Sequence, residues 1–135
     1  MRCTILAVGR LRPPYADDVQ HYRQLLSRYV QLELVEVRED DRVERRIPER
    51  SYVVLLDAEG RSYDSVAFSR WMDERKVDAR PVCFVIGGAK GLSLDHCDLK
   101  LSLGPMTLPH QLARVVLLEQ LYRGAKILAG EPYHY

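Results

Sequence analysis

The chain has 135 residues, of which 47% are hydrophobic and 29% charged, and it shows no internal repeat or low-complexity tract. These proportions are typical of a single folded domain over residues 1–135 and exclude a disordered chain. The formal net charge is only +1, from 20 basic and 19 acidic side chains, so bulk charge alone cannot hold a nucleic-acid partner and a local patch would be needed.

The cysteines and the apolar runs indicate in which cellular compartment the protein lies and whether it binds a metal. Cys3, Cys83 and Cys97 are odd in number and form no CxxC pair, which favours reduced thiols over a disulfide framework or a metal site. The first apolar run, residues 3–8, is too short for a signal peptide, and no run approaches the ~20 apolar residues of a membrane span. We therefore expect a cytoplasmic protein with no metal and no membrane partner.

The first third of the chain predicts a strand, a helix and a strand. Residues 3–8 (CTILAV) form a continuous apolar run that ends at Gly9, as expected of a strand buried on both faces. Residues 15–29 carry apolar side chains spaced by three and four, which indicates an amphipathic helix. Residues 32–37 (LELVEV) alternate, and their charges favour an edge or half-exposed strand.

Residues 38–50 predict an exposed connector. This stretch has five Arg against three Glu and two Asp, and its apolar residues show no periodicity. A solvated surface and an RNA-contacting arm are both compatible with that composition.

The middle of the chain predicts a strand and a helix. Residues 52–56 (YVVLL) form a strand that we expect to close at Asp57 and a turn over residues 58–60. Asp64 or Ser65 can cap a helix that ends before Pro81. Its expected apolar side comprises Val66, Phe68 or Ser69, Met72 and Val77, with Trp71 on the flank.

The last third predicts two more strands and a long helix. Residues 82–86 (VCFVI) form the most hydrophobic strand, and Ser93 or Asp95 can cap a short helix through Asp98. A short strand over residues 101–103 breaks at Gly104-Pro105, and a helix follows from Pro109 to about Gly130. Strands that alternate with helices predict an α/β fold with a mostly parallel sheet and helices on both faces.

Three loops of this fold suggest a ligand site. The loops after Leu56, Ile86 and Leu103 would meet at the carboxyl edge of the sheet, where ligands of open α/β sheets bind. The glycines after Ile86 occur too late in the chain for a dinucleotide fingerprint, and no Walker A motif is present, which argues against a dehydrogenase-like enzyme. Taken alone, these glycines fit a tight turn as well as a ligand contact.

The last helix and the tail carry further candidates. His110 and Arg114 are four residues apart, on one face of the helix near the loop, although a capping histidine and a surface ion pair would give the same spacing. Glu119 and Arg123 fit an intrahelical ion pair. The apolar residues of this helix spread too widely for one buried face, which favours a dimer with Leu118 and Leu121 at its interface.

Three segments resemble a known family. These are FVIGGAKGLS at residues 84–93, LSLGPMTLPHQLARVVLLEQLYRGAKI at residues 101–127, and the terminal PYHY. They closely resemble the family of ribosomal large subunit methyltransferase H (RlmH), small members of the SPOUT methyltransferase class. The resemblance covers essentially the whole chain. Relatives have a longer helical segment where this chain has only residues 38–50, and they end in a basic residue where this chain has Tyr135.

The resemblance implies an α/β-knot fold with a C-terminal trefoil knot, a homodimer, and methyl transfer from S-adenosylmethionine to N3 of a pseudouridine in 23S rRNA of the ribosome. It places the cofactor at Leu56, Gly87, Gly88, Leu103, Gly104, Pro105, Met106, Thr107 and Leu108. It places the substrate near His110, Arg114, Tyr133 and His134; Tyr and His can stack on bases and exchange protons, but a tail packed in the dimer groove is the alternative. The alternative function is a ribosome-associated dimer that binds a nucleotide without chemistry.

Overall fold

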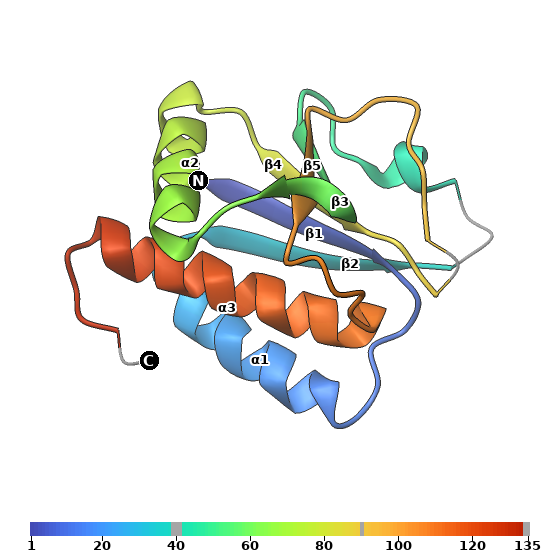
Figure 1. The fold of residues 1–135 in the computed structure, drawn as a ribbon, viewed down its shortest axis with the longest axis horizontal. Coiled ribbons are helices and arrows are strands. Elements are labelled where there is room, and N and C mark those ends of the chain that lie inside the picture. The colour runs from blue at the N-terminus through green and yellow to red at the C-terminus, as the bar shows by residue number, and fades with distance from the viewer. Residues whose placement is uncertain (39–41, 90, 134–135) are drawn as a thin grey trace.

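A five-stranded sheet forms the centre of the protein, in a computed structural model that describes residues 1–38, 42–89 and 91–133. All neighbouring strands are parallel, in the order β2-β1-β4-β3-β5 (Figure 1). The parallel sheet and the edge position of the second strand are therefore confirmed. The strands are β1 (Arg2–Val8), β2 (Gln31–Val37), β3 (Tyr52–Ser62), β4 (Val82–Ile86) and β5 (Leu99–Ser102).

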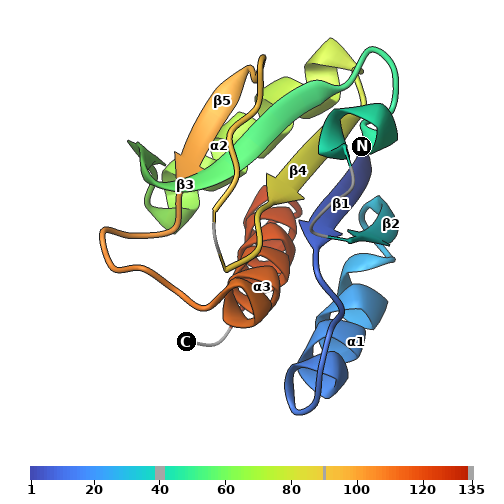
Figure 2. The ribbon, with the colours of Figure 1, turned by 90° about the vertical axis from the view of Figure 1, so that its right-hand side faces the viewer.

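The three α-helices lie on one face of this sheet (Figure 2). They are α1 (Tyr15–Leu26), α2 (Ser65–Asp78) and α3 (His110–Leu128), and α3 packs against both of the others. The opposite face is covered by a single 3-10 turn, η1 (Val43–Arg46), and by the loop after β4. Among the described residues, η1 is thus the only helical segment on the second face, where the sequence predicted helices as well.

The predicted exposed connector is partly wrong. Val43 is only 3% exposed and packs with Ile47 against the second face of the sheet. The inner strands are buried on both faces, so some part of this segment must cover them. Residues 39–41 of the connector lie outside the described residues.

The predicted short helix before β5 is absent, and residues 91–98 form a loop. Asp98 fastens this loop to the sheet, because its backbone N–H donates to the Val53 carbonyl at 2.8 Å and its Oδ2 accepts from the Val53 N–H at 2.8 Å. The loop packs on the second face of the sheet through Leu92, Leu94 and Cys97. An extended loop allows this packing because it crosses β3 to reach β5.

The predicted end of β3 is also wrong, since the strand continues to Ser62. Its pairing with β5 shifts register between Leu56 and Arg61, so residues 57–60 form an irregularity rather than a chain-reversing turn. Gly60 lies so close to β5 that a Cβ there would come within 2.5 Å of the Lys100 carbonyl oxygen. The irregularity therefore depends on glycine at this position.

The cap of α2 is confirmed, and its predicted buried face is confirmed at Phe68, Ser69 and Met72 but not at its two ends. Asp64 accepts a hydrogen bond from the Ala67 N–H at 2.7 Å. Phe68 and Trp71 stack with ring centroids 5.3 Å apart, and the side of α2 that carries them packs in the core. As a result Val66 and Val77 are exposed, Val77 by 81%.

Leu118 and Leu121 of α3 are fully buried within the monomer. They belong to the core between the sheet and the helices, so the expectation that they form a dimer interface is wrong. Packing against α1 and α2 explains why apolar residues extend so far around α3. The trefoil knot stays a prediction. Among the described residues, no helix is long and apolar enough to cross a membrane.

We expect Gly60→Ala to lower the free energy of unfolding by about 2 to 3 kcal/mol, because the added methyl group meets the backbone of β5, which cannot move away as a side chain can. Urea denaturation measures this loss. Gly130→Ala is the control: its φ is +68° but a Cβ meets nothing within 4 Å, so strain alone costs about 1 kcal/mol. Equal losses in the two variants would contradict the close packing.

Candidate functional site

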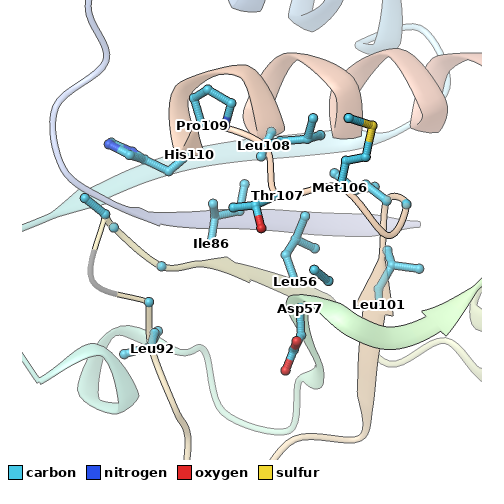
Figure 3. Close-up of a pocket in the computed structure, with 18 residues that line it drawn as sticks. Leu56, Asp57, Ile86, Leu92, Leu101, Met106, Thr107, Leu108, Pro109 and His110 are labelled. Carbon is cyan, nitrogen blue, oxygen red and sulfur yellow. The ribbon is translucent and has the colours of Figure 1, made fainter.

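A cleft of about 720 Å³ opens at the carboxyl edge of the sheet (Figure 3). Three segments form its walls: residues 56–58 of β3, the turn that follows β4, and the segment 101–110 that joins β5 to α3. Small-molecule sites commonly occupy about 300 to 1,000 Å³. The structure thus brings the three predicted loops together in a space that fits a small ligand.

Most residues predicted to bind a cofactor line this cleft. They are Leu56, Gly87, Gly88, Leu103, Gly104, Met106, Thr107 and Leu108, whereas Pro105 does not line it. Sequence reasoning missed other lining residues, namely Asp57, Ala58, Ile86, Ala89, Gly91, Leu92, Leu101, Pro109 and Ala113. Asp57 and Ile86 could have been predicted to line the cleft, because each lies at the predicted end of a strand.

The walls of the cleft are mainly apolar. Figure 3 shows Leu56, Ile86 and Leu108 around the hydroxyl of Thr107. Asp57 adds a carboxylate and His110 an imidazole. No hydrogen bond within the described part of the chain involves the backbone N–H groups of residues 106–108, which leaves these donors for a ligand. Such a cleft suits a flat, largely apolar group with a few polar edges.

Ser102 holds the segment 101–110 against β3. Its Oγ lies 3.0 Å from the Ala58 carbonyl oxygen and accepts a hydrogen bond from the Gly104 N–H at 3.1 Å. Gly104 has a φ of +141°, a conformation that residues with a Cβ rarely adopt. The turn at the start of this wall therefore depends on Ser102 and Gly104 together.

Gly87 allows the turn after β4 to fold tightly. A Cβ on Gly87 would lie 2.8 Å from Leu92 Cβ, and the Gly91 N–H donates to the Gly88 carbonyl at 2.9 Å. The glycines that resembled a nucleotide fingerprint thus serve close backbone packing, and they line the cleft as well.

His110 is the predicted substrate-side residue that the structure places in the cleft. It is the first residue of α3, directly after Pro109. It also lies beside the end of β1, because a Cβ on Gly9 would be 3.4 Å from His110 Cε1. The imidazole therefore lies between the cleft and the end of β1.

Arg114 does not line the cleft. Its side chain is buried, and its guanidinium donates to Glu36 Oε2 at 2.9 Å and to the carbonyl oxygens of Val8 and Gly9 at 3.2 and 2.7 Å. Burial lowers the pKa of Arg114, and the hydrogen bond to Glu36 opposes that shift. These contacts tie α3 to the ends of β1 and β2.

Tyr133 lies against the outer side of α3. Its hydroxyl donates to Glu119 Oε2 at 3.0 Å and its ring lies 4.3 Å from the Arg123 guanidinium carbon. The predicted Glu119–Arg123 ion pair is confirmed, at 3.1 Å. Burial and the hydrogen bond to Glu119 raise the pKa of Tyr133 to about 12, so the phenol is neutral. His134 and Tyr135 lie outside the described residues.

The thiols and the other potential ligands provide no metal centre in the part of the chain that the structure describes. No three His, Cys, Asp or Glu side chains there gather closely enough to hold a metal ion. Cys3, Cys83 and Cys97 are free, as expected. Burial raises the pKa of the Cys83 thiol to about 12, so it stays protonated and a poor ligand.

Comparison with known proteins relates the chain to one family over its whole length. A family model described as predicted SPOUT methyltransferase matches residues 1–134. The chain is 44% identical to ribosomal RNA large subunit methyltransferase H of Rubrobacter xylanophilus, over 99% of the chain and 98% of the relative. It is 39% identical to the protein of the same name from Gemmatimonas aurantiaca, over 99% of both. The first alignment covers 155 positions, 20 more than this chain has residues, which is compatible with a shortened connector.

We expect Arg114→Met to lower the free energy of unfolding by about 2 to 3 kcal/mol, because two backbone carbonyls and Glu36 lose a charged donor. Arg114→Lys recovers only part of this loss, since an ammonium group lacks the forked geometry. Thermal or urea denaturation measures both variants. Arg70→Met, at an exposed position of α2, is the control with an expected change within about 0.5 kcal/mol; an equal loss there would contradict the anchoring role.

Proposed function

The chain belongs to the SPOUT methyltransferase family, and from this premise we propose that it transfers a methyl group from S-adenosylmethionine to N3 of a pseudouridine in 23S rRNA. The observation that carries the proposal is the cleft at which three loops meet, in a chain that matches the family from end to end. The relatives' name specifies RNA of the large ribosomal subunit. The choice of base rests on the family resemblance.

The cleft fits S-adenosylmethionine in size and chemistry. Its apolar walls suit the adenine ring, and the unengaged N–H groups of residues 106–108 can donate to the edge of the ring. Asp57 can accept from ribose hydroxyls or from the amino group. When bound, the cofactor supplies an electrophilic methyl group on a positively charged sulfur. A mainly apolar cleft whose described lining residues include one carboxylate, that of Asp57, is compatible with that positive charge.

The residues of the chain have two tasks in such a reaction. They must align N3 with the methyl carbon, so that the new N–C bond forms as the C–S bond breaks, and they must accept the N3 proton. Positioning supplies most of the acceleration, and a general base adds about 10²- to 10⁴-fold. His110 is our candidate for the base because it lines the cleft. Tyr133 and His134 remain proposed substrate-side residues, and Tyr133 would have to reach the cleft by a rearranged tail or in a partner protomer.

The assembled ribosome is the substrate form that we propose. A chain of formal net charge +1 gives a dimer of about +2, and nonspecific RNA affinity grows with the number of phosphates neutralised. Contacts with the assembled particle would supply the missing affinity and hold one splayed base beside the methyl group. Such a substrate places the enzyme in the cytoplasm.

A stripe along α3 supports the proposed homodimer. Leu112, Val116 and Ile127 are half-buried, recur at the spacing of one helix face, and lie outside both hydrophobic clusters of the monomer. Glu119 and Arg123 lie on the same side. A second copy could cover this stripe where α1 and α2 do not.

The proposed function predicts that the protein binds S-adenosylmethionine and methylates ribosomes that lack the modification, with higher catalytic efficiency than on free 23S rRNA. Calorimetry measures binding, and transfer of labelled methyl groups measures activity. Binding without transfer on any RNA would support the alternative of a non-catalytic dimer that binds a nucleotide.

Two variants locate the cofactor within the cleft. We expect Gly88→Val to raise the dissociation constant for S-adenosylmethionine at least about tenfold, because the branched side chain occupies the cleft. Pro105→Ala, in the same segment but not lining the cleft, should change it less than about threefold. Unchanged affinity in folded Gly88→Val would exclude this site.

We expect Val116→Asp to convert the dimer to a monomer of 15.6 kDa, because the change buries a charge in an apolar contact. Sedimentation equilibrium at micromolar concentration measures the mass. Val77→Asp, on the exposed side of α2, should leave the mass unchanged. A wild-type monomer that still transfers methyl groups would contradict the proposed dimer.

A further inference from the structure

The loop of residues 9–12, between β1 and α1, lies beside the cleft. β1 pairs with β4, whose end forms part of the cleft wall. Gly9 lies next to His110, so close that a Cβ added to Gly9 would be 3.4 Å from His110 Cε1. In Figure 3 the ribbon that continues from β1 curves past the His110 side chain.

Polar side chains from two other elements fix the backbone of this loop. Gln111 Oε1 accepts from the Arg12 N–H at 2.9 Å, and its Nε2 donates to the Arg10 carbonyl at 2.7 Å. Glu36 accepts from the Leu11 N–H at 2.6 Å. Arg114 completes the set through the Gly9 carbonyl. Every residue of the loop is therefore held through its main chain.

Buried polar groups are an expensive way to stabilise a fold. Gln111 and Arg114 are 9% and 5% exposed, and well-packed apolar residues would often give equal or greater stability at such positions. What the hydrogen bonds add is a defined backbone conformation. These hydrogen bonds act on the loop that adjoins His110 from the side of β1. Their benefit is therefore a fixed position for the side chains that this loop carries.

The loop presents two arginines. Arg10 and Arg12 are exposed, and among the described residues neither side chain makes an ion pair or a hydrogen bond. Glu36, the acidic residue that contacts the loop, is already engaged by Arg114 and the Leu11 N–H. Within the described part of the chain, two exposed arginines without an acidic partner thus extend from a fixed backbone segment whose first residue, Gly9, adjoins His110 of the cleft.

We propose that Arg10 and Arg12 bind phosphates of the substrate RNA next to the target base, and that Gln111, Arg114 and Glu36 are positioning residues for this pair. The inference rests on the proposed function. A nearly neutral chain needs local contacts to hold RNA, and guanidinium groups suit phosphate oxygens because they donate in pairs. The fixed loop reduces the entropy lost on binding.

The test compares Arg10→Gln/Arg12→Gln with Arg70→Gln/Lys76→Gln, which removes two exposed cations from α2. Methyl transfer to unmodified ribosomes is measured between about 0.1 and 0.3 M salt, and RNA binding is measured by filter retention of 23S rRNA. We expect the loop variant to raise KM for the ribosomal substrate about 10- to 100-fold and to reduce the salt slope of 23S rRNA binding by about 1.4 to 1.8, as two lost phosphate contacts require. The dissociation constant for S-adenosylmethionine should not change.

A third variant, Gln111→Met, tests the positioning role. Methionine has a similar size and no hydrogen bond for the loop, so we expect KM for RNA to rise severalfold while the salt slope and cofactor affinity stay at the wild-type values. A slope as reduced as that of the double variant would overturn the division between binding and positioning residues.

Three outcomes would overturn the proposal: an unchanged salt slope and KM in the loop variant, an equal loss in the α2 variant, or a loss of cofactor affinity in place of RNA affinity. Failure of the proposed function has a different signature. The wild-type protein would then transfer no methyl group to any RNA, whereas filter retention would still report whether Arg10 and Arg12 bind phosphates.

Discussion

The hydrogen bonds of Arg114 are the interaction on which the arrangement of the site depends. One guanidinium joins α3 to the last residues of β1 and to Glu36 of β2. Since α3 begins at His110 and follows the cleft-lining segment directly, fixing this helix on the sheet also fixes the mouth of the cleft. Because Arg114 is buried, its hydrogen bonds are costly to form and breaking them is strongly destabilising. Such hydrogen bonds favour a single position of α3 on the sheet.

The sheet adds a second constraint, because its inner strands must be covered on both faces. The helices occupy one face, and the other is closed by η1 and a loop that crosses from β4 to β5. That loop packs Leu92 onto the sheet and brings Gly87 and Gly88 to the cleft. The same loop therefore covers the core and builds one wall of the cleft.

The sequence predicts the local features well and the long-range ones poorly. Apolar runs predict the strands, and the ends of those strands predict most residues of the cleft. Both predictions need only a few consecutive residues of sequence. The continuation of β3 was missed because Ala58-Glu59-Gly60 has the composition of a turn, and only pairing with β5 extends it. The role of Arg114 was missed because its partners Glu36 and Gly9 are 78 and 105 residues away. Leu118 and Leu121 were misplaced because helix periodicity does not distinguish a neighbouring helix from a second copy.

The short edge strand β5 has a consequence for the mobility of the cleft. It has four residues, pairs only with β3, and its pairing is interrupted at the register shift. Such a strand exchanges its amide hydrogens through local opening rather than through global unfolding. One wall of the cleft is thus joined to the sheet through its shortest strand, which lies at an edge, while the other two walls extend from inner strands. A ligand that spans all three walls would slow exchange most strongly in β5.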